Sequence, residues 1–342
     1  MRDRTRLVFS GSQRDRARSL GMLAGAAMTL GARHLIGAGT LPSWPYSVDL
    51  AHAWLKVVTR HGFDMTGADG GGIAASRAFV DAVSTRDPVL DRLRRTAANA
   101  PVPATWFTPP DSESVLMLYL HGGGYAYHAT SHASLVAYVA EAVGAATLAP
   151  DYRLAPEHTW PAQLDDAIAA YDWLCAQAAG ARRIAVAGDS AGGHLTLALL
   201  AVLLATGRPL PGCAVCIGPW VDLTNPGASM RTHERYDWVQ KRMADRWAAW
   251  LLRATPAHPL TAPLRAVAAG SGPPPLLVHV GTHEILYDMI VEHGALYRAA
   301  GHPIVVQEWP EMTHDFHAFA AMLPASRDAL RAIGGFVRQH CC

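Results

Sequence analysis

The chain has 342 residues, of which 50% are hydrophobic and 17% are charged. This length and composition allow one large α/β domain, or two ordinary ones, with a sizeable core. The formal net charge of +1 provides no general attraction for nucleic acid, so we expect no nucleic-acid partner. Five cysteines without regular spacing argue against a disulfide framework.

The N-terminus combines a basic head with an apolar segment. Residues 1–18 hold six Arg and two Asp, and an apolar stretch follows at Leu20–Leu30. This order is typical of a signal peptide, but Arg33 and His34 interrupt it, and its eleven residues are too few to span a bilayer. We expect an N-terminal arm on a cytoplasmic protein. Export, membrane-surface contact through the arm and homodimer formation stay open.

From about residue 100 onward, short apolar runs alternate with stretches of helical spacing. Such alternation predicts an α/β fold with a mostly parallel central sheet flanked by helices. The expected strands are Val115–Leu120, Ala145–Ala149, Arg183–Ala187, Cys213–Ile217, Leu276–Val280 and Ile304–Gln307. The expected helices are Ser131–Val143, Pro161–Ala178, Ser190–Ala205, Ile285–Ala300 and Arg327–Gln339.

Domain organisation follows from where this rhythm starts and breaks. Residues 1–95 are expected to form the N-terminal arm and part of a cap, and residues 96–342 the main α/β domain. The rhythm is interrupted between about residues 222 and 263, which are rich in tryptophan and charge. This segment is predicted to be an inserted helical part of the cap.

Gly188-Asp189-Ser190-Ala191-Gly192 is a Gly-x-Ser-x-Gly motif between a predicted strand and a predicted helix. This strand–turn–helix setting is the one in which a nucleophilic serine is held on a tight turn. The flanking glycines allow the turn to form, and the N-terminus of the helix favours developing negative charge. Ser190 is therefore the candidate nucleophile.

A second glycine motif, His121-Gly122-Gly123-Gly124, directly follows the predicted strand Val115–Leu120. Successive glycines leave backbone N–H groups unobstructed, so they can converge on an oxyanion. We expect Gly122 and Gly123, together with Ala191, to provide the N–H groups of an oxyanion hole. His121 is expected to hold the loop rather than to take part in chemistry.

A carboxylate and a histidine follow downstream in the order that serine hydrolases of this type require. Glu284 and Asp288 come after the predicted strand Leu276–Val280, and His314 comes after the last predicted strand. The loop position favours Glu284 as the carboxylate that orients His314. Asp288 stays open as the alternative, because it lies about one turn further on.

Taken together, these motifs resemble the bacterial hormone-sensitive-lipase family of carboxylesterases from about residue 100 to 335. The resemblance rests on five segments in one order: 121–124, Asp151–Glu157, Gly188–Gly193, Gly281–Asp288 and His314–Phe316. It implies an α/β-hydrolase fold with a helical cap. The residues that match the family's site are Ser190, His314, Gly122, Gly123 and Ala191. At the usual aspartate position this chain has Glu284.

The resemblance implies a carboxylic-ester hydrolase that forms a covalent acyl-enzyme and acts on a small-molecule ester with a short- to medium-chain acyl group. Such chemistry requires no cofactor and no metal. Two alternatives stay open. One is a non-catalytic ligand receptor on a hydrolase scaffold, and the other is an amide or formamide hydrolase.

Overall fold

The structure is a computed structural model, which describes residues 6–9, 12–112, 115–128, 132–178, 183–256, 258–263, 266 and 272–341. Ser131, where one helix was expected to begin, lies outside these residues, as do residues 1–5 of the basic head. No helix in these ranges is long and apolar enough to cross a membrane.

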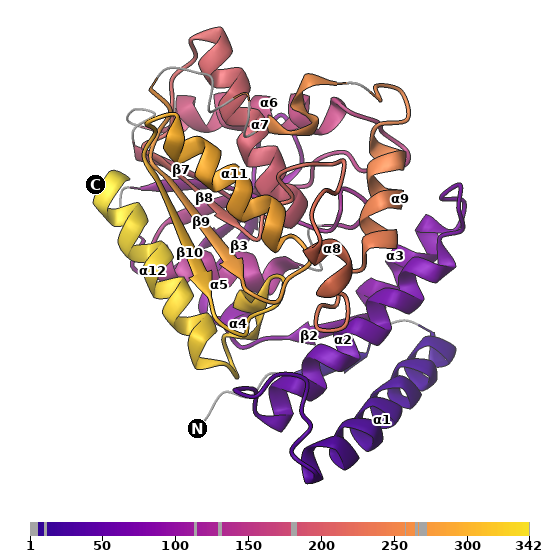
Figure 1. Ribbon diagram of the computed structural model, residues 1–342. Coiled ribbons are helices and arrows are strands. Elements are labelled where there is room, and N and C mark those ends of the chain that lie inside the picture. Colours follow the sequence, from indigo (N-terminus) through magenta and orange to yellow (C-terminus); the bar gives the residue numbers. More distant parts are fainter. Residues whose placement is uncertain are drawn as a thin grey trace.

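The centre of the molecule is an eight-stranded sheet in the order β10-β9-β8-β7-β5-β6-β4-β3 (Figure 1). Strands β5 to β10 pair in parallel, whereas β4 runs antiparallel to both β3 and β6. The strands are β3 (Arg94–Ala97), β4 (Ala104–Thr108), β5 (Leu116–Leu120), β6 (Ala146–Pro150), β7 (Ile184–Asp189), β8 (Cys213–Ile217), β9 (Leu276–Gly281) and β10 (Ile304–Trp309).

Alternating side chains divide the core into two layers, one on each face of the sheet. Leu118 of β5 belongs to the core cluster that includes α7, while its neighbour Met117 belongs to the cluster that includes α5 and α12. The helices that pack on the sheet are α5 (Ala133–Val143), α6 (Ala162–Gln177), α7 (Ser190–Thr206), α11 (Tyr287–Ala299) and α12 (Pro324–Cys341). Because both faces are covered, the central strands are mostly apolar.

Every strand and helix expected after residue 100 is present, with ends shifted by a few residues at most. The strands β3 and β4 were not predicted. Arg94–Ala97 is short and all four of its residues are exposed, so the segment carries no apolar alternation. The predicted domain boundary at residues 95/96 falls inside β3.

Two separate parts of the chain cover the carboxyl ends of the parallel strands, where the sequence motifs lie, and together they form the cap. The first contains α1 (Gln13–Leu35), α2 (Tyr46–Met65) and α3 (Ile73–Ala82), with a small sheet of β1 (Arg6–Phe9) and β2 (Val83–Arg86). The short helix α4 (Val89–Arg92) follows and packs on α5. The second is the interruption after β8, with α8 (Ser229–Thr232), α9 (Lys241–Leu251) and the 3-10 turn η3 (Pro259–Thr261). A further 3-10 turn, η4 (Phe316–Phe319), follows β10. In Figure 1, α9 lies beside α3, and α1 is the outermost helix.

The turn between β7 and α7 approaches the end of β5 so closely that it excludes side chains. A Cβ atom at Gly192 would collide with the carbonyl oxygen of Leu120, and one at Gly188 would lie 2.7 Å from that same oxygen. A Cβ at Gly193 would lie 2.7 Å from the Cβ of Pro219. These glycines are therefore required by close packing of the backbone.

Replacing Gly192 by Ala should lower the free energy of unfolding by about 3 kcal/mol, because the backbone at the end of β5 must move. The matched control is Gly335→Ala on an exposed part of α12, where a Cβ meets nothing within 4 Å. This control should gain up to about 1 kcal/mol from helix propensity. Urea unfolding measures both, and equal stability of the two variants would contradict the packing argument.

Candidate active site

Ser190 occupies a strained position at the point where β7 becomes α7. Its φ angle is +53°, in the left-handed region that residues other than glycine rarely adopt. The carbonyl oxygen of Ser190 accepts a hydrogen bond of 3.0 Å from the N–H of Trp220. The residue is partly exposed, although its neighbours are buried. The fold thus presents one side chain on a turn whose backbone is held rigidly.

His314 lies in the loop after β10, with a side chain that is 1% exposed. Its carbonyl oxygen accepts a hydrogen bond of 2.9 Å from the indole N–H of Trp238. Its Nδ1 has no hydrogen-bond partner among the described residues, and its Nε2 lies 3.3 Å from Oδ2 of Asp315. Burial lowers the pKa of His314 to about 3, so the ring is neutral at physiological pH.

Glu284 faces His314 from the loop after β9. Its Oε2 lies 4.0 Å from Nδ1 of His314 and accepts a hydrogen bond of 3.1 Å from the N–H of Gly281. A Cβ at Gly218 would lie 3.0 Å from Nδ1 of His314 and 3.3 Å from either carboxylate oxygen, so this glycine leaves room for the pair. Burial, followed by the charge of Asp237, raises the pKa of Glu284 well above its usual range.

Asp288, the alternative carboxylate, is engaged elsewhere. Its Oδ2 accepts a hydrogen bond of 2.8 Å from the backbone N–H of Ser229, and its own N–H donates to the Ser229 hydroxyl at 3.1 Å. Asp288 therefore ties the start of α11 to α8. The structure brings Glu284, and not Asp288, to His314.

The N–H of Gly122, which was expected to bind an oxyanion, has another hydrogen-bond partner in the structure. This N–H donates a hydrogen bond of 3.0 Å to Oδ1 of Asp189, which leaves it unavailable to a substrate. Among the described residues, no hydrogen bond uses the backbone N–H groups of Gly123, Gly124 or Ala191. The N–H groups that remain free to bind an oxyanion are thus those of Gly123, Gly124 and Ala191, whereas the sequence suggested Gly122, Gly123 and Ala191.

Asp189 was missed as a functional candidate, although it precedes the nucleophile in the motif. Its Oδ1 also accepts a hydrogen bond of 2.9 Å from the hydroxyl of Tyr119 on β5. A Cβ at Gly122 would collide with the Asp189 carboxylate. Asp189 thereby joins the glycine loop to the turn that carries Ser190.

His121 holds the same loop, as expected. Its Nδ1–H donates a hydrogen bond of 2.8 Å to the carbonyl oxygen of Gly122. Its ring stacks on Tyr152, with centroids 4.2 Å apart, and the Tyr152 hydroxyl donates to the carbonyl oxygen of His121 at 2.6 Å. Burial lowers the pKa of His121 to about 3, so it is a neutral structural side chain.

The cap segment between β8 and β9 contacts both the loop of Glu284 and the loop of His314, a role that the sequence did not reveal. Oδ2 of the buried Asp237 accepts a hydrogen bond of 2.8 Å from the N–H of Ile285, next to Glu284. The following residue, Trp238, binds the His314 carbonyl. In the sequence, only the tryptophan and charge content of the segment pointed to Asp237 and Trp238.

Asp315 is another buried acid beside His314, and it forms a cluster with His132 and Asp189. Atoms of His132, Asp189 and Asp315 that could bind a metal ion lie within 4.8 Å of one another. Burial, then the charge of Asp189, raises the pKa of Asp315 well above its usual range. Oδ1 of Asp189 accepts two hydrogen bonds, whereas Oδ2 of Asp189 and Oδ1 of Asp315 have no hydrogen-bond partner among the described residues.

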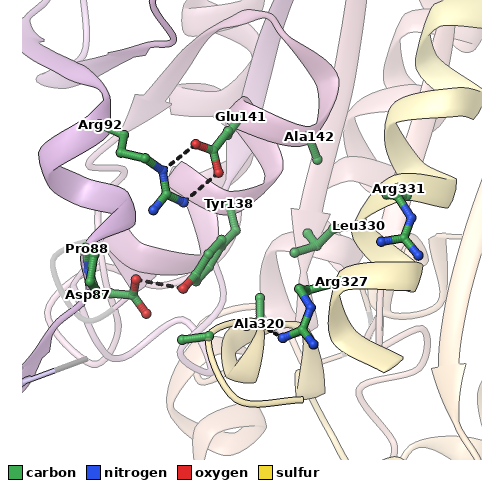
Figure 2. A pocket seen from close by; sticks show the side chains of 11 residues that line it. Asp87, Pro88, Arg92, Tyr138, Glu141, Ala142, Ala320, Arg327, Leu330 and Arg331 are labelled. Carbon is green, nitrogen blue, oxygen red and sulfur yellow. Dashed lines mark hydrogen bonds and ion pairs between the residues drawn. The ribbon is translucent and has the colours of Figure 1, made fainter. Parts of the chain in front are cut away.

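Two cavities of the described residues lie away from this arrangement. One, of about 400 Å³, is bounded by α5 and α12 and contains the Arg92–Glu141 ion pair and the hydrogen bond from Tyr138 to Asp87 (Figure 2). Another, of about 360 Å³, is bounded partly by His121. Neither is lined by Ser190, Glu284 or His314.

The glycine loop is instead covered by aromatic side chains of the cap. A Cβ at Gly124 would collide with the ring of Trp247 on α9. Phe63 of α2 and Tyr127 meet that indole edge-on, with ring centroids 6.0 and 6.2 Å from it. Both parts of the cap therefore meet above the free N–H groups.

Comparison with known proteins agrees with this fold. A family model described as an alpha/beta hydrolase fold matches residues 117–318. An acetyl-hydrolase of Streptomyces hygroscopicus is 39% identical over 275 residues, which are 75% of this chain and 90% of that protein. An ethyl acetate hydrolase of Pseudomonas putida is 30% identical over 268 residues, 74% of this chain and 83% of that protein.

Solved structures lead to the same family. The crystal structure of an esterase from the bacterial hormone-sensitive lipase family is 31% identical, with a TM-score of 0.72, and the match covers 97% of this chain and all of that one. A structure described as an esterase/lipase from an uncultured bacterium is 35% identical, with a TM-score of 0.73 and coverage of 79% and 91%. The chain belongs to the hormone-sensitive-lipase-like esterases of the α/β-hydrolase fold, and it is a carboxylic ester hydrolase.

Proposed function

We propose that the chain hydrolyses short- to medium-chain acyl esters through a Ser190–His314–Glu284 triad and a covalent acyl-enzyme. The observation that carries this proposal is the shared edge of the sheet. Ser190, Glu284 and His314 follow the carboxyl ends of β7, β9 and β10, which run in parallel. The strained turn presents the hydroxyl, and the buried acid faces the imidazole.

In the proposed first step, Ser190 Oγ attacks the ester carbonyl while His314 Nε2 takes its proton. The charge on Glu284 then stabilises the imidazolium and holds its tautomer. His314 must first turn Nε2 from Asp315 toward Ser190, and the 4.0 Å gap between Nδ1 and Glu284 must close to hydrogen-bond length. Such tightening on substrate binding is common in hydrolases. Protonated His314 then gives this proton to the ester's alkoxide oxygen as the C–O bond of the tetrahedral intermediate breaks, which releases the alcohol and leaves the acyl-enzyme.

In the second step, water activated by neutral His314 hydrolyses the acyl-enzyme. The tetrahedral oxyanion of each step is proposed to bind the N–H groups of Gly123, Gly124 and Ala191. The expected contribution of Gly122 is replaced by an indirect one, because its N–H holds the loop to Asp189. Backbone donors positioned in advance are effective because they need no reorganisation during the reaction.

The preference for short to medium acyl groups is supported by Trp247. Its ring lies against Gly124, and Phe63 and Tyr127 surround it, so an acyl chain leaving Ser190 on this side meets a rigid aromatic wall. Two relatives are named for hydrolysis of acetyl groups or ethyl acetate, which are short acyl substrates.

Changing Ser190 to Ala should lower kcat for p-nitrophenyl acetate by about 10⁴-fold or more, because the acyl-enzyme cannot form. A fluorophosphonate probe should label the wild type once per chain and leave this variant unlabelled. Circular dichroism checks that the variant is folded. Labelling at another residue, or activity within tenfold of wild type, would place the nucleophile elsewhere.

Glu284→Gln should lower kcat by roughly 10²–10⁴-fold, because the imidazole loses its orienting charge. The isosteric control, Asp288→Asn, should reduce stability by about 1 kcal/mol through its weaker bond to Ser229 and leave kcat nearly unchanged. Steady-state kinetics and urea unfolding of both variants test the assignment. A larger loss of kcat in Asp288→Asn would transfer the orienting role to Asp288.

Replacing Trp247 by Leu should raise the rate on p-nitrophenyl octanoate relative to acetate by about tenfold, since a few methylene groups gain space. The matched control, Trp173→Leu, alters a tryptophan of α6 that packs on Trp106 of β4. Its ratio of the two rates should equal that of wild type. The ratio of kcat/KM values is the measurement, and an unchanged ratio in Trp247→Leu would remove Trp247 from the acyl pocket.

A further inference from the structure

The N-terminal helix α1 is apolar on two opposite faces. Its inner face includes the buried Leu30, and Met22 and Leu23 pack against a core cluster of α2 and α3. Its outer face includes Leu20, Met28 and Leu35, which are 51%, 73% and 89% exposed. Packing on α2 and α3 explains why the inner face is apolar, but it does not explain the apolar outer face.

The outer residues form one continuous stripe. At 100° per residue, the exposed side chains lie within a sector of about 120°. They are Ala17, Leu20, Ala24, Met28, Ala32 and Leu35. The stripe continues past the helix end into Ile36, which is 79% exposed. Cβ atoms added at Gly21 and Gly25 would meet nothing within 4 Å, so nothing described covers this side.

Cations flank the stripe. Arg14, Arg16 and Arg18 are exposed in the first two turns, and Arg33 lies near the other end. The helix contains one carboxylate, Asp15, which is bound to Ser12 at 2.6 Å. Exposed apolar side chains between arginines are the pattern of a helix that lies in the plane of a membrane surface.

We propose that the outer face of α1 is a docking surface for lipid bilayers that carry anionic headgroups. The apolar stripe would enter the boundary of the acyl chains, while the arginines bind the headgroups. A second copy of the chain fits less well. In a parallel pair the arginine clusters of the two helices would oppose each other. In either a parallel or an antiparallel pair, the arginines would meet no free carboxylate on the partner helix, because Asp15 is its one acid and is bound to Ser12.

The position of α1 makes this docking compatible with catalysis. The helix is the outermost helix of the cap, and it packs mainly on α2, which carries Phe63 (Figure 1). Docking would therefore hold the cap side of the enzyme against the membrane. The inference does not depend on the proposed triad, since it rests on residues outside it.

The test is sedimentation of the full chain with vesicles of phosphatidylcholine alone or with 30 mol % (about a third) phosphatidylglycerol. The wild type should bind the anionic vesicles, and more weakly as salt increases. Leu20→Gln/Met28→Gln/Leu35→Gln should weaken binding by roughly tenfold or more, since three apolar side chains are lost. Arg14→Gln/Arg16→Gln should weaken it by about 30-fold, and only for anionic vesicles.

The matched control is Leu296→Gln/Val305→Gln, which alters two apolar side chains, each 44% exposed, on α11 and β10. It should bind vesicles as the wild type does. Hydrolysis of dissolved p-nitrophenyl acetate should be equal in all forms, which shows that they are folded. Three results would each overturn the proposal: no binding by the wild type, equal binding to neutral vesicles, or undiminished binding by the triple variant. A dimer lost in the triple variant, without vesicle binding, would assign the stripe to a second copy.

Discussion

The close contact between the β7–α7 turn and the end of β5 is the constraint on which the active site depends. Gly188 and Gly192 allow the turn to touch the carbonyl oxygen of Leu120, and Asp189 binds the N–H of Gly122 across the same contact. Ser190, the proposed nucleophile, and the glycine loop are thereby parts of one rigid unit. Because the glycine loop begins where β5 ends, a shift of the β7–α7 turn also displaces this loop.

Burial of charge is the second feature that shapes the site. Glu284, Asp315, Asp189 and Asp237 are all buried, and in each case burial is the main cause that raises the pKa of the carboxyl group. Burial acts in the opposite direction on His314 and lowers the pKa of its ring. Burial thus disfavours the charged form of each of these groups, and in the proposed mechanism the imidazolium of His314 and the carboxylate of Glu284 stabilise each other.

The cap contributes to the catalytic geometry as well as covering it. Asp237 and Trp238 hold the loops of Glu284 and His314, while Trp247 covers Gly124. The first part of the cap adds Phe63 to the same aromatic group. A substitution in the cap can therefore alter the reaction in two ways. It can change the shape of the pocket, or it can shift the loops that carry Glu284 and His314.

From about residue 115 onward, the sequence by itself determined the alternation of the sheet strands with the helices that cover them, and the positions of Ser190, Glu284 and His314 after strands. Strand and helix periods are local, and a Gly-x-Ser-x-Gly turn needs glycine for reasons that operate within a few residues. Which N–H groups remain free, and which acid faces His314, was decided only by tertiary structure. Asp189 and Gly122 are 67 residues apart, and Ser229 and Asp288 are 59 apart. Contacts at such separation leave no periodic trace in the chain, because they arise only when the sheet brings its strand ends together.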